Sequence, residues 1–130
     1  MLVVDASVAV AAAFAGNAFS ALGDDDLVAP PLMWSEARST LRLRAWHGQV
    51  HADDVEATWG WLERCPVDRH EPSELGYEAW RVADEMGWAR TYDAEYVALA
   101  RLLECRLVTL DSRLRRGADR LALVVSPAEL

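Results

Sequence analysis

The chain has 130 residues, of which 52% are hydrophobic and 26% are charged, a composition that fits one folded globular domain and excludes a disordered chain. Its net charge of −8 excludes a constitutive, non-specific coat for nucleic acid, because such binding requires a basic surface, but an enzyme that meets phosphate through a metal ion remains open. All 13 basic residues are Arg, which excludes mechanisms that depend on Lys, such as a phosphate-loop lysine or a Schiff base.

Short apolar runs alternate with longer helical segments, which predicts an α/β domain with a largely parallel sheet. Strands are expected where the apolar run is short, and helices where apolar residues recur at a helical period and the segment ends near Gly. In chain order these are strand 2–5, helices 7–15 and 17–23, strand 27–30, helices 32–47 and 51–65, strand 67–70, helices 74–86 and 91–104, strand 106–110, helical turn 112–116 and strand 121–125.

Two of the predicted strands end in a carboxylate, at opposite ends of the chain. Asp5 closes the apolar run Leu2-Val3-Val4, and Asp111 closes the run Leu107-Val108-Thr109-Leu110. Sites of open α/β sheets form beyond the carboxyl ends of their strands, so we expect both acids at one edge of one sheet. Like charges held close together raise each other's pKa unless a cation neutralises them, and carboxylate oxygens prefer hard divalent ions. The alternative for each Asp alone is a turn residue or a helix N-cap.

Two further acids lie within predicted helices. Asp93 is in the first turn of its helix, where a capping or dipole-favouring acid is the alternative, but it shares a stripe with Tyr96 and Val97 that must pack inward. A carboxylate on a buried stripe is costly without a partner, so the functional and the capping roles both remain open. Glu36 lies one turn into an earlier helix, and a solvated position is the alternative if it stands alone.

Four segments contain these acids. They are Met1-Leu-Val-Val-Asp-Ala-Ser7, Ser35-Glu36-Ala37-Arg38, Thr91-Tyr-Asp-Ala-Glu-Tyr-Val-Ala-Leu-Ala100 and Leu107-Val-Thr-Leu-Asp-Ser-Arg-Leu114. Together they resemble the PIN-domain ribonucleases, specifically the VapC toxins of bacterial toxin–antitoxin pairs, and the third segment is the most specific. The resemblance runs from end to end and is least diagnostic over residues 48–87. It implies one PIN-like domain over residues 1–130, a three-layer α/β/α sandwich around a mostly parallel, roughly five-stranded sheet.

The resemblance also implies a metal-dependent ribonuclease, an endonuclease that hydrolyses RNA phosphodiester bonds as the toxin of a VapBC-type pair. By it, four acids form the catalytic, metal-binding cluster: Asp5, Glu36, Asp93 and Asp111. The cofactor implied is Mg²⁺, with Mn²⁺ as a substitute, because such ions lower the pKa of bound water and clamp phosphate oxygens. We assign Asp5 and Asp93 as direct ligands; the other two acids bind directly, bind through water or orient the nucleophile. Ser7 matches a family position whose hydroxyl supports the site.

Candidate partner contacts lie outside the acids. Three arginines follow the last acid closely enough to contact RNA phosphate, with a solvated helix face as the alternative: Arg113, Arg115 and Arg116. Four of the six Trp fall in the two helices that directly follow the second strand: Trp34, Trp46, Trp59 and Trp61. Aromatic residues mostly build cores, but Trp59 and Trp61 cannot face one side of a helix, so part of this set is expected to be exposed. By the resemblance, this region binds the cognate VapB-type antitoxin, and the toxin pairs with itself as a homodimer.

Cysteine usage and the N-terminus bear on the compartment. Cys65 and Cys105 lie outside any CxxC spacing, which favours reduced thiols in a cytoplasmic protein. We also expect no signal peptide and no membrane partner, because the chain starts directly with a strand and has no apolar stretch of about 20 residues.

Other functions remain open from the sequence. Haloacid-dehalogenase-like phosphatases and exonucleases of the RNase H type would carry an acid at position 7, where Ser7 stands, and the former also use a Lys. From a different class, a catalytically idle PIN-like interaction module would fail to bind Mg²⁺ or Mn²⁺. Zinc is disfavoured, because His47 and His51 have Gly48 between them and no third ligand is evident.

Overall fold

A five-stranded sheet forms the centre of the computed structural model, which describes residues 1–15 and 19–130. Its strands are β1 (Leu2–Val4), β2 (Leu27–Ala29), β3 (Asp68–Arg69), β4 (Arg106–Val108) and β5 (Val124–Val125). Every neighbouring pair is parallel, in the order β3-β2-β1-β4-β5. The central strand β1 is buried throughout, as a strand with both faces covered must be, and Val3 aligns with Val28 on one side and Leu107 on the other. The predicted α/β class is therefore confirmed.

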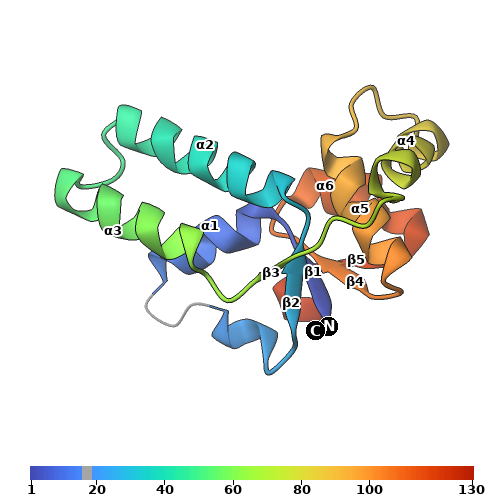
Figure 1. Ribbon diagram of the computed structural model, residues 1–130, viewed down its shortest axis with the longest axis horizontal. Coiled ribbons are helices and arrows are strands. Elements are labelled where there is room, and N and C mark those ends of the chain that lie inside the picture. The colour runs from blue at the N-terminus through green and yellow to red at the C-terminus, as the bar shows by residue number, and fades with distance from the viewer. Residues whose placement is uncertain (16–18) are drawn as a thin grey trace.

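Helices cover both faces of the sheet (Figure 1). Helices α1, α2 and α3 pack against one another on one face, whereas α5 lies against β1 and β4 on the other, with α4 outside it. The chain moves outward from β1 to β3 and then returns past β1 to β4 and β5, and right-handed crossovers in opposite directions place their helices on opposite faces. The helical segments are α1 (Ala6–Phe14), η1 (Ser20–Leu22), α2 (Leu32–Trp46), α3 (Ala52–Glu63), α4 (Leu75–Met86), α5 (Tyr92–Leu102), α6 (Ser112–Gly117), η2 (Asp119–Leu121) and η3 (Pro127–Glu129).

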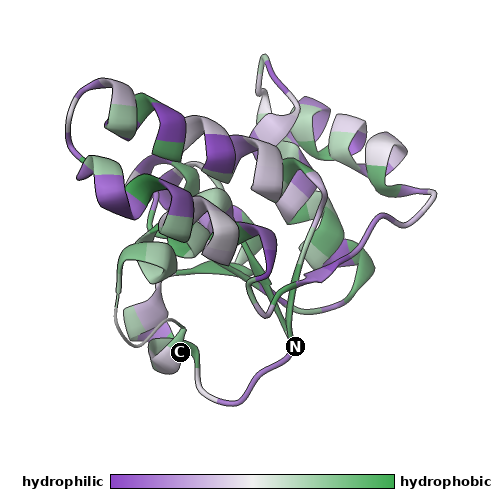
Figure 2. Cartoon of the chain, turned by 60° about the vertical axis from the view of Figure 1, so that its left-hand side comes forward, coloured by the Kyte–Doolittle hydropathy of each residue, from purple (hydrophilic) through white to green (hydrophobic). Residues whose placement is uncertain are grey.

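The core is formed by the strands and the inward faces of the helices. Hydrophobic residues concentrate on the strands, and hydrophilic residues recur along the outward turns of α2 and α3 (Figure 2). Helix α5 is deeply buried, with Ala94 and residues 96–100 each at most 1% exposed, because it is enclosed between the sheet and α4. None of the helices that the structure describes combines the length and hydrophobicity needed to cross a membrane.

The predicted elements differ from the structure mainly at the strand ends. The predicted strand 121–125 contains only Val124–Val125, because Asp119–Leu121 forms a 3-10 turn and Ala122 adopts the left-handed backbone conformation. The helix predicted at 17–23 corresponds to the 3-10 turn Ser20–Leu22, and its first two residues lie outside the described part of the chain. The other predicted helices are present, with ends within two residues of the predicted bounds.

Candidate active site

The strand order reverses between β1 and β4. From β1 the chain continues through α1 to β2, and from β4 it continues through α6 to β5 on the opposite side. In open α/β sheets, ligand sites form in the crevice beyond the carboxyl ends of the strands at such a reversal. Asp5 follows β1 directly and Asp111 lies three residues beyond the end of β4, and both line one cleft at this edge. Both acids therefore lie at one edge of one sheet, as the strand-end pattern predicts.

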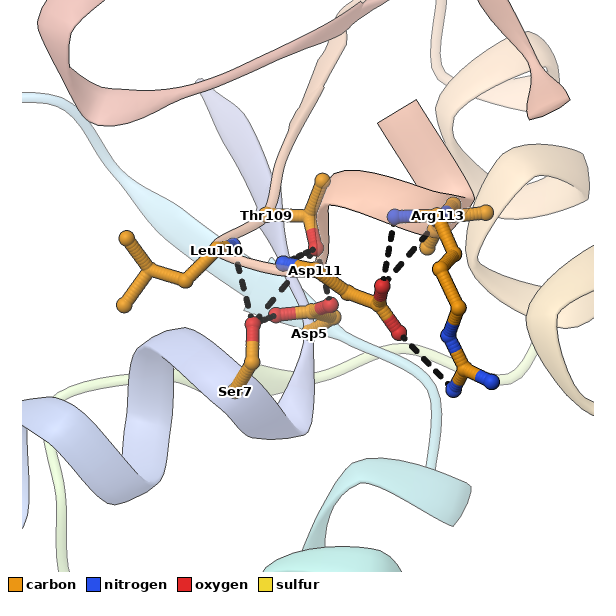
Figure 3. A network of polar contacts seen from close by, with 7 residues as sticks. Asp5, Ser7, Thr109, Leu110, Asp111 and Arg113 are labelled. Atoms are coloured by element: carbon orange, nitrogen blue, oxygen red, sulfur yellow. Dashed lines mark hydrogen bonds and ion pairs between the residues drawn. The ribbon is translucent and has the colours of Figure 1, made fainter. Parts of the chain in front are cut away.

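Asp5 is the most enclosed of the acids, only 5% exposed. Its Oδ1 accepts a hydrogen bond from Ser7 Oγ (2.5 Å) and its Oδ2 accepts one from Thr109 Oγ1 (2.5 Å) (Figure 3). The backbone N–H of Val8 donates a further bond to Oδ1 (3.1 Å). Burial raises the pKa of the Asp5 carboxyl, whereas these hydrogen bonds favour the charged form and oppose the shift. Both carboxylate oxygens are therefore held in place by the surrounding chain.

The two hydroxyls connect the turn after β1 to the turn after β4. Ser7 Oγ accepts a hydrogen bond from the Leu110 N–H (2.9 Å), and Thr109 Oγ1 accepts one from the Asp111 N–H (2.9 Å). Each hydroxyl thus donates to Asp5 and accepts from the backbone leading to Asp111, which positions the two acids relative to each other. The support assigned to Ser7 fits this geometry. Thr109 was missed, although a lone hydroxyl within an apolar strand run was a signal for it.

Asp111 is both a helix N-cap and a residue of the cleft, the two roles that the sequence left open. Its Oδ1 accepts hydrogen bonds from the backbone N–H groups of Arg113 (2.8 Å) and Leu114 (3.3 Å), so it is the N-cap of α6. Its Oδ2 lies 3.7 Å from Nη2 of Arg113, and its side chain lines the cleft. Asp5 is likewise the N-cap of α1. Capping and a place in the site are therefore compatible at both strand ends.

Glu36 is brought to the cleft by α2 and is held by a residue of α5. The hydroxyl of Tyr96 donates a hydrogen bond to Glu36 Oε2 (2.8 Å), although the ring of Tyr96 is almost completely buried. Burial raises the pKa of the Glu36 carboxyl, the hydrogen bond from Tyr96 opposes that shift, and the charges of Asp93 and Asp5 raise it further. Sequence reasoning treated Tyr96 as a core residue and missed its second role as a hydrogen-bond donor.

Asp93 differs from the other acids because it has no hydrogen-bond partner within the described part of the chain. The expectation that it belongs to the buried stripe of its helix is wrong: Tyr96 and Val97 are buried, but Asp93 is an exposed residue, because α5 begins at the rim of the cleft. Partial burial of its carboxyl and the charges of Asp111 and Asp5 raise its pKa. The ionised form of Asp93 is therefore disfavoured, and its side chain borders the open cleft.

The cleft that these acids share has a volume of about 590 Å³ and is open to solvent. Its donors suit a hard divalent cation, because all four acids contribute oxygen, and the raised pKa of Asp5, Glu36 and Asp93 means that nearby positive charge would stabilise their ionised forms. Within the described residues, however, no three His, Cys, Asp or Glu side chains already converge as a metal-ligand set. The cluster fits such an ion in its chemistry, but its side chains must draw together to hold one. Zinc remains disfavoured, because the side chain of His51 caps α3 by accepting a hydrogen bond from the N–H of Asp53 (3.3 Å).

The three candidate arginines lie in different environments. Arg113 lines a hollow beside Asp111 and Asp93. Arg115 instead pairs with Glu129, with its Nε 2.7 Å from a carboxylate oxygen, so its guanidinium is engaged at the C-terminal turn. Arg116 is exposed on α6 and lines neither side of the acid cluster. Of the three, only Arg113 is placed to reach a ligand bound at the acids.

The four candidate Trp also separate into groups. Trp46 and Trp59 are 74% and 47% exposed, as the spacing argument required of part of the set. Trp34 is buried, with the guanidinium of Arg69 over its ring, and Trp61 is half-buried against Phe19. The assignment of Trp34 to an exposed antitoxin-binding surface is therefore wrong, because its face of α2 packs into the core.

Comparison with known proteins agrees with this architecture. A sequence model of the PIN domain matches residues 2–120. The chain belongs to the PIN domain family. Within the family it is similar to VapC ribonuclease Mb0985 of Mycobacterium bovis and to ribonuclease VapC9 of Mycobacterium tuberculosis. It is 37% identical to each over 115 residues, which cover 88% of either chain.

Two solved structures share this fold. PAE2754 from Pyrobaculum aerophilum superposes with a TM-score of 0.75 at 26% sequence identity, covering 98% of this chain and 91% of that one. A chain in the structure of FitAB bound to a DNA fragment superposes with a TM-score of 0.68 at 12% identity, covering 100% and 97%. At that identity the second likeness concerns the fold alone.

Proposed function

We propose that this PIN domain is a metal-dependent ribonuclease that hydrolyses RNA phosphodiester bonds and acts as the toxin of a VapBC-type pair. The observation that carries the proposal is that four acids from four separate segments line one cleft at the strand-order reversal. The names of the relatives, which are VapC ribonucleases at 37% identity, support both the reaction and the toxin role. The expected compartment is the cytoplasm, and two free cysteines are compatible with it.

We assign Asp5 and Asp93 as direct ligands of Mg²⁺ or Mn²⁺, with Glu36 and Asp111 binding directly, binding through water or orienting the nucleophile. When bound, such an ion supplies an activated water and positive charge against the phosphate. The residues around the acids set their geometry: Ser7 and Thr109 hold Asp5, and Tyr96 orients Glu36. These supporting hydrogen bonds matter because the position of a ligand oxygen depends on the groups behind it.

The test is RNA cleavage by wild type and Asp5→Asn, with Mg²⁺, with Mn²⁺ and with a chelator. Asp5→Asn retains shape and removes a charged ligand oxygen, so we expect cleavage to fall at least roughly 100-fold while the protein stays folded. Asp24→Asn is the control, because Asp24 lies in an exposed run of three acids, Asp24–Asp26, and has no ion pair within the described residues. Its neighbour Asp25 is less suitable, because it pairs with the N-terminal amine at 2.7 Å. Wild-type cleavage by Asp5→Asn, or undiminished cleavage with chelator, would contradict the mechanism.

Metal binding has a separate readout in stability. An ion that binds only the native state raises the free energy of unfolding, so millimolar Mn²⁺ should raise the thermal midpoint of the wild type by several degrees. The double variant Asp5→Asn/Asp93→Asn should show no such rise. An equal rise in both proteins would place the ion elsewhere, and no rise in the wild type would favour the catalytically idle interaction module.

We further propose a VapB-type antitoxin as partner, bound through the exposed Trp46 and Trp59, with a cationic side chain reaching the acids of the cleft. Exposed aromatic side chains are frequent energetic centres of interfaces. Trp46→Ala and Trp59→Ala should each weaken binding of the antitoxin encoded beside this gene by about 10-fold or more, without loss of RNA cleavage. Trp80→Ala, at an exposed Trp of α4, is the matched control. Wild-type antitoxin affinity in both Trp46→Ala and Trp59→Ala would refute this surface.

The family resemblance also supports the proposal that the toxin forms a homodimer. Light scattering of the purified chain measures this directly, as a mass of twice 14.4 kDa. A monomer over the whole accessible concentration range would contradict it.

A further inference from the structure

The acid cluster lies between two hollows rather than at the bottom of one. The first, of about 590 Å³, extends from the acids along α1 and α2. The second, of about 570 Å³, extends from the acids toward the turn before α5 and the start of α6. Three acids line both hollows: Glu36, Asp93 and Asp111. A ligand longer than the cluster therefore has space on both sides of it.

The first hollow ends at an arginine and an aromatic ring. Arg44 of α2 holds its guanidinium carbon 5.3 Å from the ring centroid of Phe14 of α1, and Phe14 is 44% exposed. No carboxylate in the described residues pairs with Arg44, and it is the one basic residue lining this hollow. Arg44 lies eight residues after Glu36, about 12 Å along the helix at 1.5 Å per residue, so it contacts a different part of a bound strand from the acids.

The second hollow repeats this combination on the other side. Tyr92, 57% exposed, and Trp88 line it together with Arg90 and Arg113. Arg90 has no ion pair within the described residues, and Arg113 has only its 3.7 Å contact with Asp111. In a chain of net charge −8, arginines beside aromatic rings on both flanks of an acid cluster are an arrangement suited to an anionic ligand with flat rings.

We propose that two clusters of arginine and aromatic side chains hold the RNA on opposite sides of the scissile phosphate: Phe14 with Arg44 on one flank, and Tyr92 with Arg90 and Arg113 on the other. Proteins bind single-stranded nucleic acid by combining base stacking on aromatic rings with cationic contacts to the backbone, and in a duplex the paired bases do not offer their faces to such rings. The inference rests on the proposed ribonuclease function. It adds which residues hold the nucleotides on each side of the cut.

The test measures cleavage of a random-sequence pool of end-labelled, single-stranded RNA by Arg44→Gln and Tyr92→Ala. We expect each variant to lower kcat/KM about 5-fold or more, chiefly through KM, because stacking and backbone contacts of this kind are worth roughly 1–3 kcal/mol per base. Two matched controls should cleave like the wild type: Arg42→Gln, also on α2 and also over an aromatic ring, and Tyr77→Ala, an exposed Tyr on α4.

Substrates shortened on one flank distinguish the two sides. For an RNA with a mapped cut, the effect of Arg44→Gln should vanish when one flank is removed, and that of Tyr92→Ala when the opposite flank is removed. Wild-type kcat/KM in both variants would overturn the proposal, and so would a single truncation that removes the effects of both. It would also be overturned if Arg44→Gln weakened antitoxin binding but left RNA cleavage unchanged. These outcomes leave RNA cleavage by the wild type intact, whereas a wild type that cuts no RNA refutes the proposed function itself.

Discussion

The two halves of the acid cluster are held in different ways. Asp5 and Asp111 follow strands, cap helices and accept three and two hydrogen bonds respectively. Glu36 and Asp93 are carried by helices from opposite faces of the sheet; the first accepts one hydrogen bond from Tyr96, and the second accepts none within the described residues. The sheet edge thus provides a rigid pair of carboxylates, and the helices provide a pair with freedom to adjust. Such a division suits a site whose ligands must converge on an ion.

The largest expected effect concerns the freest acid. Asp93→Asn should reduce RNA cleavage at least roughly 100-fold, as expected for loss of a direct ligand, although Asp93 makes no hydrogen bond that supports the fold. Without metal, the thermal midpoint of the Asp93→Asn variant should equal or exceed that of the wild type, because repulsion from Asp111 and Asp5 is removed. Asp84→Asn, exposed on α4, is the control. If Asp93→Asn lowers the thermal midpoint without metal, the side chain of Asp93 supports the fold and is not free to adjust.

A smaller effect is expected on the rigid half. Thr109→Val removes the hydroxyl that holds Asp5 Oδ2 and accepts the Asp111 N–H, so cleavage should fall about 10- to 100-fold. Because Thr109 is buried and its partners lose a bond, the free energy of unfolding should fall by about 1–3 kcal/mol. Both are measured by cleavage kinetics and urea unfolding.

Thr58→Val serves as the control for that experiment. Thr58 is also buried and hydrogen-bonded, but its hydroxyl donates to the Asp54 carbonyl within α3, away from the acids. Its stability can fall while its cleavage stays at the wild-type rate. If Thr109→Val loses stability but cleaves normally, the hydroxyl supports the fold only.

The smallest effect is the pH dependence of stability without metal. The pKa of Glu36 and of Asp93 is raised from ordinary values of 4.5 and 3.8, first by burial and then by neighbouring acids. The native state therefore binds more protons than the unfolded chain between the ordinary and the raised pKa, so the free energy of unfolding should fall as pH rises through that window.

Urea unfolding across pH, with chelator present, measures this contribution. Glu36→Gln/Asp93→Asn should flatten the fall in stability relative to wild type, and Asp84→Asn should not. Saturating Mn²⁺ should also remove much of the fall, because the cation favours the ionised carboxylates. An unchanged profile in the double variant would mean that the repulsion in this half is too weak to influence folding.

Several features of the site depended on local pattern and were predictable. The apolar runs before Asp5 and Asp111 identify buried strands because a strand with both faces covered has no polar position to spare. The order of strands and helices then indicates a parallel sheet, and carboxyl ends of parallel strands share an edge. The position of Glu36 and Asp93 at the same cleft came instead from the family resemblance, because a single acid on a helix has no local signature of function.

What the sequence determined by itself was therefore the α/β class, the elements and the two strand-end acids. The tertiary structure decided which residues are neighbours across the fold. It buried Trp34, exposed Asp93 at the rim, paired Arg115 with Glu129, and brought the hydroxyls of Thr109 and Tyr96 to acids 104 and 60 positions away in the chain. Helical and strand periods report only which side of one element a residue occupies, whereas a hydrogen bond or a shared cleft requires the packing of several elements at once.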